Sequence, residues 1–256
     1  MLFMLFVLPQ ILLLGGGLAD KTSISMPTAA RTHQSRERVF VVGLVTGEIS
    51  GTVSGRGGRN RLHRLSASAA GLCQALRRGY LFKGLTVVLT DDIDADGAAV
   101  SIPIFLGDFD GQGHKLSNYK VENTQTAGLV CNAVSVTFRN LIVENAAVKA
   151  VNDGSGNAYA GVFVGRSYGT IVFANCQAVN STVEGVNKVG GMLGFVAENH
   201  IEATGCKVVG CTISNINVPE ESGQIGGFAG YLGNLYNSAC PFAYCITKST
   251  VVPAVN

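Results

Sequence analysis

The sequence predicts an all-β chain built as a repetitive β-solenoid, specifically a right-handed parallel β-helix of the pectate-lyase type, with a short N-terminal capping helix. Two observations predict this fold. One pattern recurs four times, with its opening glycines 33, 30 and 36 residues apart, and periods of this length are typical of stacked supersecondary units. The segments between turns are short and rich in Val, Ile and Thr, and no stretch after Leu85 carries the apolar stripe of an amphipathic helix.

Residues 1–19 are almost wholly apolar and read MLFMLFVLPQILLLGGGLA. A membrane span needs about 18–20 such residues, but Pro9, Gln10 and three glycines interrupt this run. Small residues at 17–19 suit a cleavage site, so we expect a signal peptide at 1–19, with an uncleaved anchor helix as the alternative. Both readings predict a secreted or cell-surface protein with no integral membrane domain beyond the leader.

Residues 20–65 form a basic linker to which we assign no element. Residues 1–83 hold 11 Lys and Arg against three acids, whereas residues 84–256 hold eight against 14. A basic arm could contact an anionic surface. The basic residues lack the interleaved aromatics of a base-stacking platform, so we expect no nucleic-acid partner.

The repeat domain is expected to span residues 66–256 and to open with the capping helix at 66–79. Ser66 or Ser68 can cap this helix, and Gly79 can end it. A helix at this place would cover the open end of the solenoid core and its exposed strand edge. Residues 83–93 then read as the first strand.

Two anchor positions mark each repeat from Thr126 onward. We expect the first, a glycine, to lie where the backbone has positive φ or where backbones approach closely. We expect the second to form an internal ladder of buried, reduced thiols, because seven cysteines without a C-x2-C pair support neither a disulfide framework nor a zinc site. The first anchor is Gly128, Gly161, Gly191 and Gly227, and the second is Leu141, Cys176, Cys206 and Cys245.

Several segments resemble bacterial surface, adhesin-like proteins with GLUG-type repeats. The resemblance rests on LTVVLTDDID (85–94), on FDGQGH (109–114), and on the repeat cores GVFVG (161–165), GMLGFV (191–196) and GFAGYL (227–232). It covers the chain from about Leu72 to Val251. It implies a secreted or cell-surface location in a bacterium.

Three carboxylates, Asp92, Asp94 and Asp96, are spaced like the start of a calcium loop. Pro103 stands where such a loop needs its bidentate acid, so a solvated acidic turn is the favoured interpretation and calcium the weaker one. We expect no other metal site and no cofactor.

Asp108, Asp110 and His114 resemble an acid–base cluster of the kind that polysaccharide-degrading enzymes use. The alternative is turn chemistry, in which Asp110 bonds the nearby backbone, Gly111 and Gly113 permit the turn, and His114 orients it. We favour the turn.

These observations predict a non-catalytic module for adhesion, binding or surface assembly, whose partner is a glycan or a host or matrix protein. A carbohydrate-active β-helix enzyme, either a lyase or a hydrolase, is the alternative. A catalytic groove would need several charged side chains stacked on one face, whereas the repeats offer mostly Asn, Ser, Thr and Gly.

Overall fold

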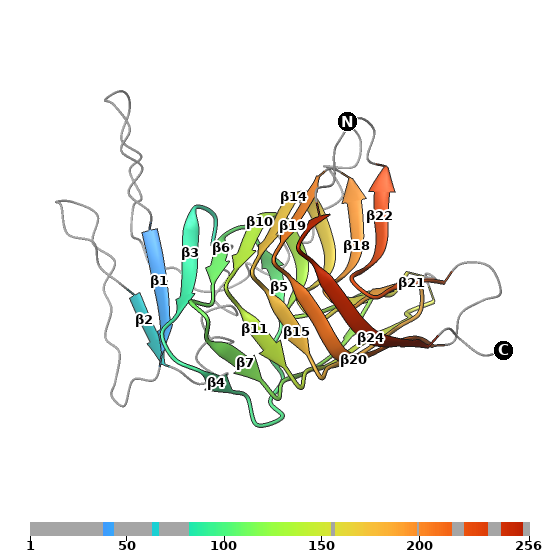
Figure 1. The fold of residues 1–256 in the computed structure, drawn as a ribbon, viewed down its shortest axis with the longest axis horizontal. Helices are drawn as coiled ribbons and strands as arrows, with labels where there is room; N and C mark the ends of the chain where they lie inside the picture. Colours follow the sequence, from blue (N-terminus) through green and yellow to red (C-terminus); the bar gives the residue numbers. More distant parts are fainter. Residues whose placement is uncertain are drawn as a thin grey trace, which may run out of the picture. The chain divides into compact units, whose positions relative to one another are not determined.

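The computed structural model describes residues 38–43, 63–66, 82–154, 157–198, 200–216, 223–234 and 242–252. These residues form 24 β-strands and no helix, and all their strand pairs are parallel. The strands belong to three sheets, which we name A, B and C (Figure 1). The predicted all-β parallel solenoid is therefore confirmed.

Sheet A has 11 strands and holds the opening strand of each coil. Its central path runs in the order β2-β1-β3-β6-β10-β14-β18-β22. Its members are β1 (Arg38–Gly43), β2 (His63–Ser66), β3 (Leu85–Leu89), β5 (Ile102–Phe105), β6 (Asp108–Asp110), β10 (Val130–Arg139), β14 (Val164–Ala174), β18 (Leu193–Glu198), β19 (Ile201–Thr204), β22 (Ala229–Asn234) and β23 (Phe242–Ala243).

Sheet B has nine strands and sheet C has four. Sheet B contains β4 (Ile93–Asp94), β7 (Lys115–Ser117), β8 (Lys120–Thr124), β11 (Ile142–Glu144), β12 (Ala147–Val151), β15 (Gln177–Val179), β16 (Thr182–Gly185), β20 (Lys207–Asn215) and β24 (Ile246–Val252). Sheet C contains β9 (Thr126–Ala127), β13 (Tyr159–Gly161), β17 (Lys188–Gly190) and β21 (Gln224–Gly226).

From β6 onward, each complete coil passes through the three sheets in turn. One coil runs along β14 in sheet A, β15 and β16 in sheet B, and β17 in sheet C, and the chain then returns to sheet A at β18. The return places Leu193 in register with Val164. One coil cannot bury its own apolar face, so the stack of coils supplies the core.

The N-terminal end of sheet A contains strands from the segment expected to be a linker. β1 lies between β2 and β3, so the order along the chain and the order in the sheet differ here. The segment 20–65 thus contributes β1 and three residues of β2 to sheet A. Ser66, one of the expected caps of the helix, is the last residue of β2. The remainder of the 66–79 helix and the 1–19 leader lie outside the described residues.

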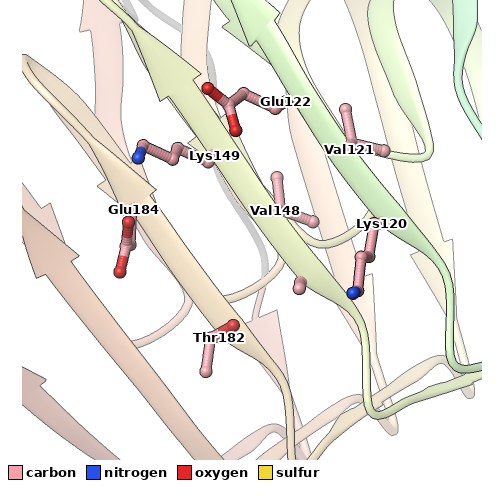
Figure 2. Close-up of a pocket in the computed structure, with 8 residues that line it drawn as sticks. Lys120, Val121, Glu122, Val148, Lys149, Thr182 and Glu184 are labelled. Atoms are coloured by element: carbon pink, nitrogen blue, oxygen red, sulfur yellow. The ribbon is translucent and has the colours of Figure 1, made fainter. Parts of the chain in front are cut away.

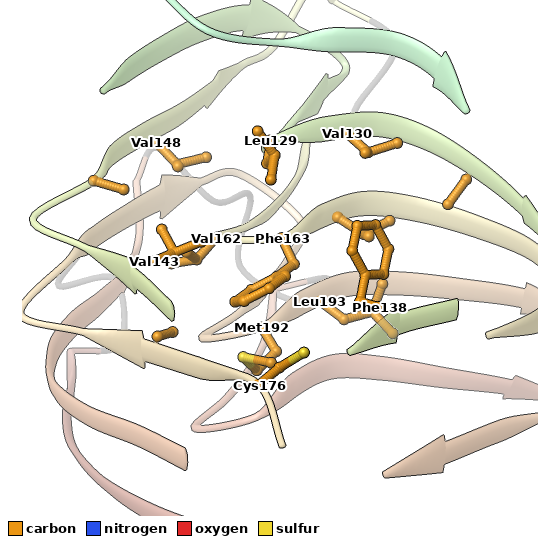
Figure 3. Close-up of a cluster of buried hydrophobic side chains, with 14 of the residues drawn as sticks. Leu129, Val130, Phe138, Val143, Val148, Val162, Phe163, Cys176, Met192 and Leu193 are labelled. Atoms are coloured by element: carbon orange, nitrogen blue, oxygen red, sulfur yellow. The ribbon is translucent and has the colours of Figure 1, made fainter. Parts of the chain in front are cut away.

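The core is a set of side-chain ladders along the solenoid (Figure 3). Phe109, Phe138 and Phe173 occupy one register position in three successive coils. Their rings stack with centroids 6.2 Å and 5.5 Å apart, and all three are fully buried. Phe163, which also lies in the core, meets Phe138 edge-on. Such aromatic pairs contribute about 0.5–1.5 kcal/mol each beyond burial.

The second anchor position forms another ladder. The pairings on either side place Leu141, Cys176, Cys206 and Cys245 at one position of four successive coils. The thiols of Cys176 and Cys206 are free and fully buried. Cys245, in the last coil, is free but only half-buried, which differs from the expected full burial. No later coil among the described residues covers it.

The opening glycines follow a different register from the expected one. Gly161 pairs with Gly190, and Gly190 pairs with Gly226. The expected equivalence of Gly161 with Gly191 and Gly227 is therefore wrong by one residue. The error arises because the third and fourth repeats have two adjacent glycines where the second has Gly161 and Val162.

These glycines are required by close approach and not by positive φ. None of Gly161, Gly191 and Gly227 has a left-handed backbone. A Cβ on Gly161 would lie 2.7 Å from the Cα of Leu193, and one on Gly191 would lie 2.5 Å from the Cγ1 of Val208. There is no room for a side chain at either position.

Candidate binding surface

The FDGQGH segment forms a turn that is anchored to the next coil. Asp110 accepts hydrogen bonds from the Nε of Arg139 at 2.8 Å, the amide of Asn140 at 3.2 Å and the backbone N–H of Gln112 at 2.9 Å. Burial opposes ionisation, but these three donors outweigh it and lower the pKa of Asp110. The carboxylate therefore ties the turn to the coil above it.

The two glycines of this turn serve different purposes. Gly113 has φ of +86°, which favours glycine. Gly111 does not have positive φ, and a Cβ there would lie 2.5 Å from the carbonyl oxygen of Asn140. The turn thus needs one glycine for its conformation and one for its contact with the neighbouring coil.

The expected acid–base residues hold separate contacts. Asp108 accepts a hydrogen bond from the backbone N–H of Thr137 at 3.1 Å. The Nδ1 of His114 lies 3.1 Å from a carboxylate oxygen of Asp92, which also accepts the backbone N–H of Lys115 at 3.0 Å. His114 thus pairs with Asp92 and not with Asp108 or Asp110. This arrangement is that of a structural turn.

The three calcium candidates do not converge. Asp92 is directed at Lys115 and His114, and Asp94 accepts the side-chain amide of Asn118 at 2.9 Å. Asp96 is exposed and donates its own backbone N–H to Asp94. Within the described ranges, no three acidic, His or Cys side chains form a group that could hold a metal ion.

A ridge of aromatic and basic side chains lies where sheet C turns into sheet A. Arg166, Phe195 and Tyr231 occupy one register position on β14, β18 and β22. Tyr159 on β13 pairs with Lys188 on β17, across the corner from them. We define the aromatic–cationic ridge as Tyr159, Arg166, Tyr168, Lys188, Phe195 and Tyr231.

Glycines on sheet A bring the two columns of the ridge together. A Cβ on Gly194 would lie 2.7 Å from the backbone nitrogen of Ala160, and one on Gly230 would lie 2.8 Å from the carbonyl carbon of Lys188. The backbones of the two sheets therefore touch at this corner. Phe195 and Tyr231, which follow Gly194 and Gly230 in the sequence, can therefore contact the side chains of Tyr159 and Lys188 on sheet C.

Three rings of the ridge contact one another, and two of them, Phe195 and Tyr231, are stacked. The centroids of Tyr159 and Phe195 are 4.8 Å apart, and those of Phe195 and Tyr231 are 5.4 Å apart. The Nζ of Lys188 lies 5.2–5.5 Å from all three ring centres. The guanidinium of Arg166 lies 4.5 Å from the ring centre of Tyr168 and 5.4 Å from that of Phe195. Both cations are within the range of cation–π attraction.

The two cations of the ridge have no acidic partner among the described residues. Lys188 donates to the side-chain oxygen of Asn187 at 2.8 Å. Partial burial, and then the nearby charge of Arg166, lower the pKa of Lys188. The Nε of Arg166 is buried and has no hydrogen-bond partner within the described chain. The two cations therefore have cation–π contacts but no counter-ion within the described residues.

Sequence reasoning did not identify the ridge. Its signal was present in the repeat cores, since Arg166, Phe195 and Tyr231 each follow the second glycine of GVFVG, GMLG and GFAG. No such signal marked Tyr159 and Lys188 as members of the ridge. Their contact with the sheet A residues depends on how closely the backbones of sheets A and C approach each other.

A second, shallow groove lies on the outer side of sheet B. It is lined by charged residues of β8, β12 and β16, including Glu122, Lys149 and Glu184. These three share one register position, and Lys149 lies between the two acids (Figure 2). Alternating charges on neighbouring strands compensate one another. The groove therefore offers a ligand less uncompensated charge than the ridge does.

Comparison with known proteins shows the fold but no family. No family model matches the chain. A 95-residue segment, 36% of this chain, is 38% identical to halomucin of Haloquadratum walsbyi, and it spans 1% of that protein.

The structure is similar to the crystal structure of a proposed immunoglobulin A1 protease from Bacteroides ovatus. The TM-score is 0.52 at 18% sequence identity, and the match covers 73% of this chain and 66% of the other. At this identity the likeness concerns the fold alone. None of the described residues forms a helix that is long and apolar enough to cross a membrane.

Proposed function

We propose that this chain is a secreted or cell-surface β-solenoid module that binds a glycan or a host or matrix protein without catalysing a reaction on it. The observation that carries the proposal is the aromatic–cationic ridge, six side chains from five strands that lie side by side on neighbouring coils. Solenoids commonly use such continuous surfaces for binding.

The proposed location rests on three likenesses. The leader at 1–19 is typical of exported proteins. A segment of this chain is similar to part of halomucin, whose name is that of a mucin. The repeat cores resemble those of bacterial surface proteins with GLUG-type repeats.

The absence of catalysis is proposed from the contacts of the acidic residues. Asp110 is held by Arg139 and Asn140, and Asp92 is held by His114 and Lys115. A glycosidase needs two carboxyl groups about 5–10 Å apart on either side of a substrate site. The sheet B groove brings Glu122 and Glu184 to one face, but Lys149 lies between them (Figure 2).

A binding screen tests the proposal directly. The full chain would be applied to an array of neutral and acidic glycans and to immobilised matrix proteins, and tested in parallel for depolymerisation of the same glycans and for cleavage of immunoglobulin A. We expect saturable binding and no turnover. Turnover that persists through purification would favour an enzyme, and the absence of any binding would contradict the proposal.

Export has its own test. Mass spectrometry of the protein from its native host is expected to find the mature chain starting near Asp20, in the medium or the cell-surface fraction. An intact Met1 in the cytoplasmic fraction would contradict a secreted location while leaving the binding proposal to be judged by the screen.

A further inference from the structure

We infer that the aromatic–cationic ridge binds an acidic polysaccharide, with carboxylate or sulfate groups on Arg166 and Lys188. This inference rests on the proposed binding function and names the class of ligand for it. Three features of the ridge support it: its uncompensated positive charge, the orientation of its rings, and its position on a sheet face.

The charge of the ridge selects an anion. Arg166 and Lys188 approach the same ring, with the guanidinium 5.4 Å and the Nζ 5.3 Å from the ring centre of Phe195, and neither cation pairs with an acid among the described residues. A carboxylate or sulfate suits this site, because Arg binds planar and tetrahedral oxyanions through charge-assisted hydrogen bonds.

The rings reinforce the same preference. Phe195 and Tyr231 are stacked at an interplanar angle of 25°, and Phe195 is tilted by 33° from Tyr159. The faces of these rings carry the negative part of the aromatic quadrupole. Neighbouring rings and the two cations already cover much of these faces, so a ligand meets mainly the ring edges. Tyr159 is buried and donates its hydroxyl to the side-chain oxygen of Asn157 at 2.7 Å. The ring edges of Phe195 and Tyr231 and the hydroxyl groups of Tyr168 and Tyr231 remain, and these groups are positive at hydrogen and suit the oxygen-rich surface of a sugar.

The surroundings favour a polysaccharide over nucleic acid. Residues 84–256 hold eight Lys and Arg against 14 acids, so two local cations stand on an acidic body. Binding to a phosphate backbone relies on many basic contacts spread along a face. A polysaccharide that carries a charge only on some of its sugars needs fewer contacts of this kind.

The position of the ridge favours a polysaccharide over a peptide. Four of the five ridge strands, β13, β14, β17 and β18, pair with neighbouring strands on both sides, and β22 alone ends sheet A. Most of the ridge therefore presents side chains alone. A peptide that adds to a sheet needs an unpaired strand edge. On the neighbouring strands, Asn132 pairs with Arg166 and Gln224 pairs with Lys188. The side-chain amides of these two residues can bind sugar hydroxyls.

The test compares ligands of defined charge on the full chain and on matched variants. The ligands are polygalacturonate, heparin, neutral dextran, poly-glutamate and single-stranded DNA. The variants are the double substitution Arg166→Gln with Lys188→Gln, and the control Lys149→Gln, which removes one cation from the sheet B groove. Circular dichroism and thermal unfolding would establish that each variant is folded.

We expect polygalacturonate or heparin to bind the natural chain and dextran to bind it much more weakly. The double variant should lose about tenfold or more in affinity, and Lys149→Gln should change it by less than about twofold. Binding should weaken as NaCl is raised from about 50 mM to about 500 mM.

Three outcomes would overturn the inference. They are equal binding of dextran, equal or tighter binding of poly-glutamate or DNA, and acidic-glycan binding that survives in the double variant. If the chain binds a neutral glycan or a matrix protein in the screen and yet fails here, only the ligand class is wrong. If it binds nothing in either experiment, the proposed function fails with it.

Discussion

The side-chain amide of Asn175 donates a hydrogen bond to the side-chain oxygen of Asn140 in the preceding coil, with the two atoms 3.3 Å apart. Both residues have a left-handed backbone, with φ of 54° and 52°, and asparagine adopts this conformation more readily than most residues. Asn140 continues the ladder to Asp110. In the next coil, Gly205 takes the same position with φ of 66°, where a Cβ would collide with the side-chain oxygen of Asn175.

Substitutions at Asn175 separate the backbone conformation from the ladder hydrogen bond. Asn175→Gly keeps the left-handed backbone and loses the bond, so it should cost about 0.5–1.5 kcal/mol of unfolding free energy. Asn175→Ala loses the bond and adds left-handed strain, so it should be about 1 kcal/mol less stable than the glycine variant. Urea unfolding measures both. Equal stability of the two variants would mean that φ does not select the residue here.

The close-approach glycines should be intolerant of a single methyl group. Gly161→Ala places a Cβ against three backbone atoms, among them the Cα of Leu193 at 2.7 Å, and backbone can yield only if neighbouring coils separate. We expect a loss of about 2–4 kcal/mol. Denaturant midpoints would be compared with those of Gly154→Ala.

Gly154 is a suitable control because it has φ of +94° and nothing within 4 Å of its position for a Cβ. Alanine there adds strain but no clash, so the loss should be about 1 kcal/mol. If both alanine variants lose the same stability, the coils are less tightly apposed at Gly161 than the structure indicates.

The sequence was sufficient to predict the solenoid and its thiol ladder, because both depend on spacing along the chain. Cys176 and Cys206 lie one period apart, and a parallel register keeps equal spacing on one face. The glycine register was misjudged because Gly190 and Gly191 are adjacent and identical. Spacing alone cannot distinguish which of them faces Gly161.

The ridge could not be predicted for a different reason. Its two columns belong to different sheets, and their contact depends on the backbone approach at Gly194 and Gly230. A repeat pattern contains no measure of the angle between two sheets. The strands β1 and β2 were missed because β1 lies between β2 and β3, an order that no periodicity of the chain predicts.

The thiols should react in an order set by their burial. Burial raises the pKa of Cys176 to about 12 and that of Cys206 to about 11, and alkylation requires the thiolate. Iodoacetamide at about pH 8 should therefore label these two far more slowly than the half-buried Cys245. Peptide mass spectrometry would give the rate at each site, with denatured protein as the reference. Rapid labelling of Cys206, or a disulfide between any two, would contradict the internal ladder.

The contact of Asp110 with Arg139 should make stability depend on pH at the acid end. Because the pKa of Asp110 is lowered in the folded chain, its contribution is fully present above the unfolded value of about 4 and is lost as pH falls through the folded value. Asp110→Asn removes the charge, and since Asp110 is only 14% exposed the cost at neutral pH should be about 1–3 kcal/mol.

The difference between the natural chain and Asp110→Asn should therefore be constant from neutral pH down to about pH 5 and should shrink below about pH 4. Urea unfolding at several pH values measures it. Asp96→Asn is the matched control, because Asp96 is exposed and its substitution should cost less than about 0.5 kcal/mol. If the difference in unfolding free energy between the natural chain and Asp110→Asn stays the same at pH 3, or grows there, the ionised carboxylate does not hold the turn. The effect of the substitution would then come from the shape of the side chain and not from its charge.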